Sequence, residues 1–272
     1  GSRLQISTDQ LIAGVHIDPA ARPGQMARKL LRRSLSDLAA AGAQPWAVLW
    51  NVAAPYDKGL AWMKRLARAF VEEASLFGMS VVGGDLSNAD QVVLSCTVIG
   101  LEGRVRTPGR GGARAGHRLL VTGRLGAAVS SGRHLLPEPR LTEGRLLAES
   151  YRASAMIDLS DGLSEDLQRM CAASACGAVV ELSKLPLARC LRHQEDGWSS
   201  ALGEGEDYEL LVALRPAEAK RALVDTVLTG AGIHEIGRIV GFNGRRGDKR
   251  IVWTVDGENM DIRIAGWEHQ WK

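Results

Sequence analysis

The sequence predicts an α/β fold in two domains. Short apolar runs, which are typical of buried strands, alternate along the chain with longer stretches in which apolar residues recur every three to four positions, as in an amphipathic helix. A glycine- and arginine-rich segment, 103–116, interrupts this alternation near the middle of the 272 residues. We therefore expect an amino-terminal αβ domain over residues 1–113 and a larger carboxyl-terminal αβ domain over residues 114–272.

Apolar periodicity places the elements of the first domain. The clearest helix is expected where five apolar residues share one face: Met26, Leu30, Leu31, Leu35 and Leu38. In chain order, the expected elements are a strand at 4–8, a helix at 24–41, a strand at 46–53, a helix at 60–77, a short strand at Val81-Val82 with a turn at Gly83-Gly84-Asp85, and a strand at 92–99.

The second domain is expected to begin with a strand at 119–122. A buried strand at 153–157 and a helix carrying Leu163, Leu167 and Met170 follow, and 208–214 predicts another strand. Asp161 falls where the helix should begin, and a carboxylate there can accept hydrogen bonds from the unpaired N–H groups of the first turn. The sequence therefore predicts Asp161 as a helix cap, a metal ligand, or both.

Composition indicates an ordinary globular protein and excludes several classes. The chain is 45% hydrophobic and 24% charged, and no apolar run is long enough to span a bilayer, so we expect a cytoplasmic protein without a membrane partner. A net charge of +3 is too small to indicate nucleic-acid binding. The cysteines form no CxxC pair, which favours buried free thiols over disulfides or a zinc site: Cys96, Cys171, Cys176 and Cys190.

Aspartates recur where the expected strands end. Asp158 and Asp161 flank Ser160 after one strand, Asp9 follows Ser7 and Thr8 on another, and Asp37 and Asp85 stand in comparable places. Any one of them can be a cap or turn residue. If they converge, two carboxylates about 4 Å apart repel by roughly 4 kcal/mol at an effective dielectric of 20, and cations would relieve this repulsion. Magnesium, which prefers oxygen ligands and commonly bridges nucleotide phosphates, suits such a cluster and points to phosphoryl transfer.

The usual nucleotide-binding and hydrolase motifs are missing from the sequence. There is no GxxxxGK[ST] loop, no GxGxxG entry to a helix, no HRD/DFG pair and no GxSxG. A cluster of five arginines has two interpretations, a clamp on an anionic ligand or a solvated connection between domains: Arg104, Arg106, Arg110, Arg114 and Arg118.

Taken in order, the motifs of this chain resemble those of the thiamine-monophosphate kinase family over essentially the whole sequence. The motifs are Ser7-Thr8-Asp9 with Gly14-Val15-His16, the segment 35–43 around Ser36-Asp37, Val82-Gly83-Gly84-Asp85, the segment 121–126, Asp158-Leu159-Ser160-Asp161-Gly162, Gly205-Glu206-Asp207-Tyr208 and Gly266-Trp267-Glu268-His269. Each motif is modest alone, but together and in this order they are specific.

The resemblance implies a fold, a reaction and a set of site residues. The family belongs to the superfamily of aminoimidazole ribonucleotide synthetase, whose members have two αβ domains and pair their amino-terminal sheets into a barrel across a homodimer. The implied reaction transfers the γ-phosphoryl group of ATP to thiamine monophosphate, with several Mg²⁺ ions. By matching position, the implied metal ligands are Ser7, Thr8, Asp9, Asp37, Asp85, Asp158 and Asp161. The implied ATP contacts are Gly84, Asp85, Arg110 and Ser160, and the implied substrate contacts are His16, Glu206 and Trp267.

Two alternatives to the kinase stay open at this point. One is another ATP-dependent synthetase of the same superfamily, against which the segment 206–208 and Trp267 argue. The other is a non-catalytic binder of nucleotide or thiamine phosphate, because the sequence lacks an upstream Gly-Asp-Asp type segment that adds a metal carboxylate in the family. Ala67, His117 and Ala127 are further departures from the family pattern, the first at a position that is usually aromatic and the other two at positions that are often acidic.

Overall fold

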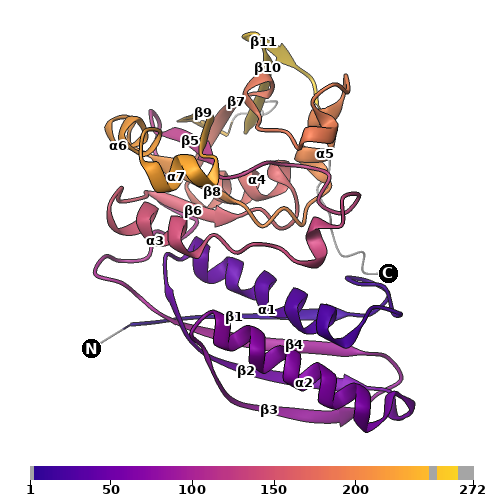
Figure 1. Ribbon diagram of the computed structural model, residues 1–272. Coiled ribbons are helices and arrows are strands. Elements are labelled where there is room, and N and C mark those ends of the chain that lie inside the picture. The colour runs from indigo at the N-terminus through magenta and orange to yellow at the C-terminus, as the bar shows by residue number, and fades with distance from the viewer. Residues whose placement is uncertain (1–2, 245–249, 263–272) are drawn as a thin grey trace.

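The computed structural model describes residues 3–244 and 250–262, which fold into two sheets with helices packed on them (Figure 1). The first sheet has four strands in the order β1-β4-β2-β3, of which only the β2 and β3 pair is parallel. Its elements are β1 (Leu4–Ile12), α1 (Pro23–Ala40), β2 (Gln44–Ala54), α2 (Gly59–Leu76), β3 (Ser80–Asn88) and β4 (Val93–Leu101).

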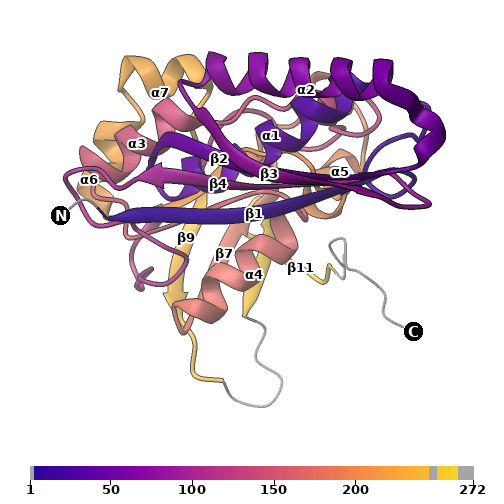
Figure 2. The ribbon, with the colours of Figure 1, turned by 90° about the horizontal axis from the view of Figure 1, so that it is seen from below.

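Helices α1 and α2 cover one face of this sheet (Figure 2). The apolar face of α1 is fully buried, with Met26, Leu30, Leu31 and Leu35 all at 0% exposure against the alternate inward residues of β4. Alternation along β1 turns Ser7 and Asp9 toward α1, whereas Ile6 and Thr8 point to the uncovered face. The polar residues of the β1 motif are therefore divided between the two faces of the sheet.

The second sheet has seven strands in the order β11-β10-β7-β9-β5-β8-β6. Its strands are β5 (Arg118–Val121), β6 (Ala155–Asp158), β7 (Cys176–Glu181), β8 (Leu210–Leu214), β9 (His234–Gly241), β10 (Ile251–Val255) and β11 (Glu258–Met260). Its helices are α3 (Leu141–Glu149), α4 (Leu163–Ala173), α5 (Gly197–Gly203), α6 (Pro216–Ala222) and α7 (Thr226–Ala231). Short 3₁₀ turns lie at Tyr56–Lys58, Arg133–Leu135, Leu182–Lys184 and Arg189–Leu191.

Helix α1 lies between the two sheets (Figure 1), which explains why so much of its surface is buried. One side of α1 packs on the four-stranded sheet, while Ala39 near its end joins the core formed by β5, β6, β8 and the helices α3, α6 and α7. The helix that carries Asp37 is thus in contact with both halves of the molecule.

Most of the expected elements are confirmed, within a few residues at their ends. The turn expected at Gly83-Gly84-Asp85 is wrong, because β3 runs straight through these residues and pairs with β2. Gly84 is needed there for close approach: a Cβ atom on it would lie 1.8 Å from the carbonyl oxygen of Trp50. Of the glycine pair that locally favours a turn, Gly84 is the residue that lets the two strands pack closely.

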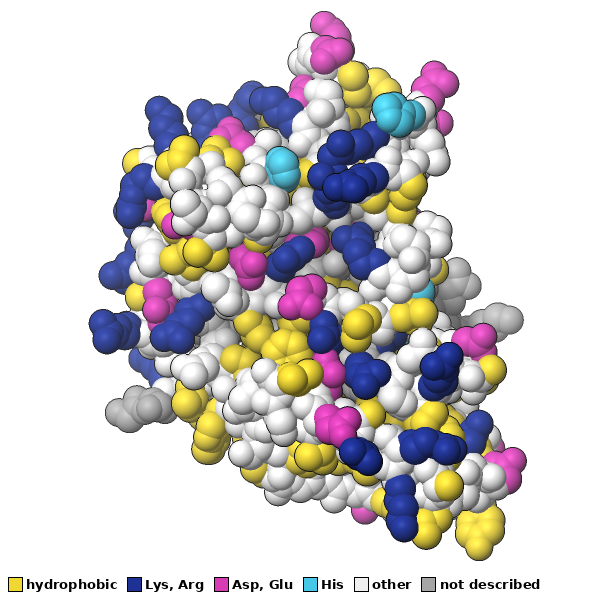
Figure 3. Space-filling model, in the orientation of Figure 1, with side chains coloured by type: hydrophobic (Ala, Val, Ile, Leu, Met, Phe, Trp, Pro, Cys, Tyr) yellow, Lys and Arg dark blue, Asp and Glu magenta, His cyan; other side chains and the backbone are white. Residues whose placement is uncertain are grey.

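The expectation of buried free thiols is confirmed for three of the four cysteines. All four cysteines are free, and Cys96, Cys171 and Cys176 are buried, whereas Cys190 is exposed. In the part of the chain that the structure describes, none of the helices has the length and apolar character needed to cross a membrane. On the face shown in Figure 3, acidic side chains lie among the Lys and Arg side chains, in keeping with the small net charge.

Candidate active site

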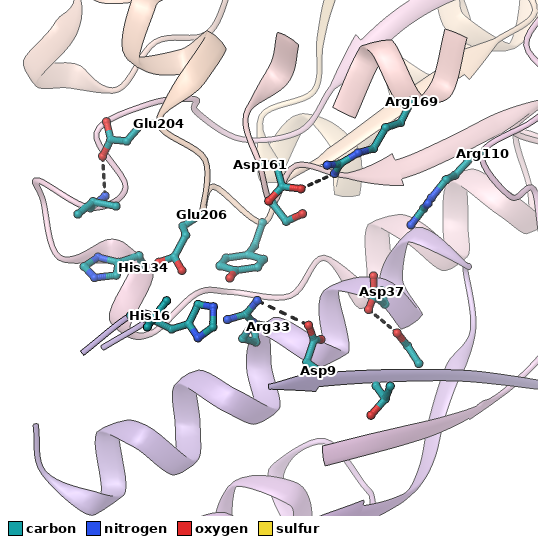
Figure 4. Close-up of a pocket in the computed structure, with 16 residues that line it drawn as sticks. Asp9, His16, Arg33, Asp37, Arg110, His134, Asp161, Arg169, Glu204 and Glu206 are labelled. Atoms are coloured by element: carbon teal, nitrogen blue, oxygen red, sulfur yellow. Dashed lines mark hydrogen bonds and ion pairs between the residues drawn. The ribbon is translucent and has the colours of Figure 1, made fainter. Parts of the chain in front are cut away.

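A cavity of about 720 Å³ lies where α1 and β1 meet the loops that precede α4 and β8 (Figure 4). Nine of the residues expected at the site line it: Ser7, Thr8, Asp9, His16, Asp37, Arg110, Ser160, Asp161 and Glu206. They come from both halves of the chain, so the cavity forms only when the two sheets pack against each other through α1.

One end of the cavity carries the aspartates of β1 and α1. Ser7 donates a hydrogen bond of 2.5 Å to Asp37, and Arg110 extends toward the same carboxylate (Figure 4). Burial, and next the negative charge of Asp9, raise the pKa of Asp37 above its ordinary value. A bound cation would stabilise the ionised form of Asp37, which burial and the neighbouring carboxylate disfavour.

The loop between β6 and α4 adds Ser160 and Asp161 to this end. The carboxylate of Asp166, on α4, accepts hydrogen bonds of 3.0 Å from the backbone N–H groups of Ser160 and Asp161. Burial raises the pKa of Asp166 to about 7. Arg169 contacts both Asp161 and Asp166. The loop is therefore held by α4, with the Asp161 carboxylate at the cavity wall.

The expectation that Asp161 caps this helix is wrong. Gly162 occupies the cap position of α4, and no side chain bonds to the first turn there. Gly162 has a φ of +101°, and a Cβ atom on it would lie 2.6 Å from the carbonyl oxygen of Leu202. Glycine therefore permits a close backbone approach here. The tight turn places the Asp161 side chain at the cavity wall, where its carboxylate pairs with Arg169 of α4.

Asp158 lies beneath the cavity rather than in its wall. It is the last residue of β6, with only 7% of its surface exposed. Burial, and then the charges of Asp37 and Asp166, raise the pKa of its carboxyl well above the ordinary value. An ionised Asp158 would therefore add to the repulsion among the aspartates of the cavity from inside the protein.

The other end of the cavity is formed by His16 and Glu206. Oε2 of Glu206 lies 2.7 Å from Nζ of Lys29, whose side chain is completely buried. Nδ1 of His16 accepts a hydrogen bond of 3.0 Å from the backbone N–H of Ile12, which orients the ring. Glu206 and Tyr208 both have positive φ values, 57° and 53°, and such costly conformations often occur at functional sites.

Some of the expected residues are not in the cavity. Trp267 lies outside the described residues. Thr8 contributes to the wall, but its hydroxyl donates to the carbonyl oxygen of Cys96. Gly84 and Asp85 stand on β3, the edge strand farthest from β1. With two strands between them, the distance from β1 to β3 is about 14 Å at the usual strand spacing, so Asp85 of one chain does not join the cluster.

The cavity by itself is not a complete metal cage. Among residues 3–244 and 250–262, no three His, Cys, Asp or Glu side chains lie close enough together to hold a metal ion. The donor set nevertheless fits Mg²⁺, because this ion is usually bound by one or two carboxylates, with waters and substrate phosphates supplying the remaining oxygens.

Four residues in or next to the cavity were not predicted from the sequence. Arg33, Arg169 and Glu204 line the wall, and Lys29 lies beneath Glu206. The Glu204 carboxylate accepts hydrogen bonds from the backbone N–H groups of Ala127, Val129 and Ser130. A signal for two of them was present, since Lys29, Arg33 and Asp37 are spaced by four residues and share one face of α1.

Among the five arginines, only Arg110 lines the cavity, so the clamp interpretation stays a prediction for this residue. The other four differ, since Arg104, Arg106 and Arg114 are exposed and Arg118 pairs with Glu235 at 3.3 Å. Arg104, Arg106 and Arg114 fit the other interpretation, a solvated connection between the domains.

Comparison with known proteins links this geometry to a family. Residues 1–101 match the family model of AIR synthase related proteins for the N-terminal domain, and residues 90–247 match that for the C-terminal domain. A thiamine-monophosphate kinase of Caulobacter vibrioides is 33% identical over 99% of this chain and 81% of its own. That of Escherichia coli K12 is 35% identical over 98% of this chain and 86% of its own. Among solved structures, AaThiL complexed with AMPPCP and TMP superposes with a TM-score of 0.83 at 26% identity, covering 99% of this chain and 88% of that one.

Proposed function

Because this chain belongs to the thiamine-monophosphate kinase family, an ATP-dependent group of phosphotransferases, we propose that its cavity transfers the γ-phosphoryl group of ATP to thiamine monophosphate. The products would be thiamine diphosphate and ADP. The observation that carries this proposal is that Asp9, Asp37 and Asp161 face the same cavity as His16 and Glu206. One end thus suits metal-bound phosphates and the other suits the cationic end of the acceptor.

We infer that Mg²⁺ ions bind at the acidic end, held by Asp9, Asp37 and Asp161 with help from Ser7. Thr8 contributes from the cavity wall, and Asp158 and Asp85 complete the expected set from outside it. When bound, the ions would neutralise the phosphate charge that builds up during transfer. The raised pKa values of Asp37 and Asp158 support this assignment, since burial and neighbouring aspartates disfavour the ionised form of each acid and a bound cation would favour it.

Arg110 and Ser160 are proposed to contact ATP. The Arg110 guanidinium extends over Asp37 from the linking segment, where it can donate to phosphate oxygens as a planar fork. The backbone of Ser160 is fixed by Asp166, so its hydroxyl is presented at the cavity from a rigid loop.

Gly84 and Asp85 are proposed to reach the site through a homodimer. The free edges of the four-stranded sheet are β1 and β3, and Ile6 on β1 and Leu49 on β2 are 62% and 38% exposed. Closing two such sheets into a barrel would place β3 of one copy beside β1 of the other, and twofold symmetry makes both junctions equivalent. Asp85 of the partner subunit would then approach Ser7 and Asp9.

His16, Glu206 and Trp267 are proposed to bind thiamine. Glu206 provides a negative partner for the thiazolium cation, and the Trp267 ring can stack on this cation with a gain of about 0.5 to 2 kcal/mol.

The domain boundary between residues 113 and 114 and a cytoplasmic location stay predictions. The gap between the end of β4 at Leu101 and the start of β5 at Arg118 is compatible with that boundary.

Calorimetry with thiamine monophosphate, combined with a coupled assay for ADP, tests the proposed function. The kinase should bind thiamine monophosphate and release ADP only when this acceptor, ATP and Mg²⁺ are all present. Binding without ADP release would favour a non-catalytic binder, and turnover with a different acceptor would favour a synthetase.

A further inference from the structure

Arg33 is a positively charged residue of the cavity wall to which none of the roles proposed above is assigned. It projects from α1 between Asp9 on one side and His16 and Glu206 on the other (Figure 4). Its Nη2 atom lies 3.6 Å from Oδ1 of Asp9, and 16% of its side chain is exposed. Arg33 therefore stands between the acidic end of the cavity and the end assigned to thiamine.

The hydrogen-bonding capacity of Arg33 is largely unused. Its Nε and Nη1 atoms are buried and have no hydrogen-bond partner among the residues that the structure describes. Arg140, by contrast, forks onto Glu209 through Nε and Nη2, both at 2.7 Å. An interior arginine that serves only stability is expected to resemble Arg140, since unpaired buried donors are costly.

The charge of Arg33 defines what can bind next to it. A metal ion or a thiazolium ring is repelled by a guanidinium, which is always protonated. Cations are therefore directed to Asp37 and Asp161 on one side, where Asp161 also pairs with Arg169, and to Glu206 on the other, which also pairs with Lys29. The ligand group that lies between them should be an anion. Thiamine monophosphate has this order of charges, because its phosphate is joined to the cationic thiazolium through a short alkyl arm.

We propose that Arg33 binds the phosphate group of the acceptor and thereby selects thiamine monophosphate over thiamine. The inference rests on the proposed function and deepens it by naming the residue that recognises the acceptor phosphate. Asp9 holds the guanidinium over the cavity at a distance too long for a hydrogen bond. A small rotation of the side chain turns its fork toward a phosphate without breaking any hydrogen bond within the described chain.

Calorimetry with two ligands, thiamine monophosphate and thiamine, tests this inference in the presence of Mg²⁺ and without ATP. Arg33→Gln should weaken binding of thiamine monophosphate about 10- to 100-fold, as expected for the loss of charge-assisted hydrogen bonds, and leave thiamine binding unchanged. Arg33→Lys keeps the charge but loses the fork, so its loss should be intermediate. Arg28→Gln removes a charge from the same helix outside this cavity and is the matched control.

The ratio of the two affinities decides the outcome. If Arg33→Gln weakens both ligands equally, or neither, Arg33 is only a counter-ion of Asp9 and the inference is wrong. Should Arg33→Gln not fold, an unchanged ratio in Arg33→Lys overturns it in the same way. Failure of the proposed function has a different signature, because the unmodified protein would then release no ADP with ATP, Mg²⁺ and thiamine monophosphate, whatever the ratio of the two affinities.

Discussion

The ammonium group of Lys29 lies 2.7 Å from the carboxylate of Glu206, although 177 positions separate the two residues in the chain. The same ammonium donates to the carbonyl oxygen of His16 at 2.6 Å, and the lysine side chain is fully buried. Burial lowers the pKa of Lys29, while Glu206 opposes this shift. One cation therefore joins the loop after β1, helix α1 and the loop before β8 at the end of the cavity assigned to thiamine.

This ion pair predicts an asymmetric response to mutation. Glu206→Gln leaves a buried ammonium without its carboxylate and should destabilise the fold by about 3 kcal/mol. Lys29→Met should cost less, because the Glu206 side chain is 21% exposed and can be hydrated from the cavity. Urea unfolding of both variants measures the difference. Equal losses, or a double variant no more stable than Glu206→Gln alone, would contradict this interpretation.

Asp158→Asn should separate function from stability. The substitution removes a buried negative charge that Asp37 and Asp166 disfavour, so the melting temperature should stay the same or rise. Phosphoryl transfer should fall at least about 100-fold, as is typical when one electrostatic contribution to the transition state is lost. Asp161→Asn should cause a similar loss of activity.

Asp225→Asn is a suitable control for these two variants. Asp225 caps α7 and accepts a hydrogen bond from Tyr151, and neither residue lines the cavity. Asparagine caps a helix about as well as aspartate, so the stability should change by less than about 1 kcal/mol and the activity per folded molecule should not change. If the activity of Asp158→Asn were likewise unchanged, Asp158 would have no role in phosphoryl transfer.

The raised pKa of Asp207 predicts that the stability of the fold depends on pH. Burial raises its pKa to about 7, despite hydrogen bonds from the N–H of Gly126 and an ion pair of 2.6 Å with Arg133. An unfolded aspartate titrates near pH 3.9. Between these values the folded protein binds a proton that the unfolded chain has released. The contribution of Asp207 to stability is therefore full below about pH 4 and declines as the pH rises to about 7.

Asp207→Asn should reduce this decline. Urea unfolding between pH 4.5 and 7.5 should give a shallower slope of unfolding free energy against pH than in the unmodified protein. The slope should not vanish, because burial also raises the pKa of Asp166 to about 7. Parallel slopes in the two proteins would show that Asp207 titrates at its ordinary pKa.

Ile6→Lys should abolish the proposed dimer. Ile6 pairs in register with Ile99 and is 62% exposed on the uncovered face of the sheet. A charge at this position should halve the mass measured by sedimentation, since an unpaired ammonium in an apolar interface is costly. Val224→Lys, at a residue that is 78% exposed near α6, is the control and should not change the mass. A monomeric unmodified protein would exclude the proposed barrel.

Elements with strong periodicity could be predicted from the sequence. Helix α1 was found because its five apolar residues repeat at helical spacing, and β4 because its apolar run is long. The turn at 83–85 was predicted wrongly because its decisive contact is nonlocal, since only the neighbouring carbonyl of Trp50 explains why glycine is needed. The Asp161 cap failed for a related reason, since Asp166 already satisfies the loop N–H groups from the following helix.

In the candidate site, too, contacts between residues distant in the sequence could not be predicted. Asp9, Asp37 and Asp161 could be proposed because each follows or faces an apolar run, and the cavity brings them together. Lys29 was missed because its partner Glu206 is remote in the sequence. Asp85 was grouped with the other acids by its motif, but the strand order separates it from them within one chain. A single sequence carries no direct information on which strands become neighbours.

The central claim is that this cavity makes thiamine diphosphate, and ³¹P nuclear magnetic resonance of the reaction mixture tests it most directly. With ATP, Mg²⁺ and thiamine monophosphate, the monophosphate resonance should disappear as the resonances of thiamine diphosphate and ADP grow in equal amounts. The reaction should require all three components and be lost in Asp158→Asn. ADP accompanied by inorganic phosphate, with the thiamine monophosphate resonance unchanged, would contradict the claim.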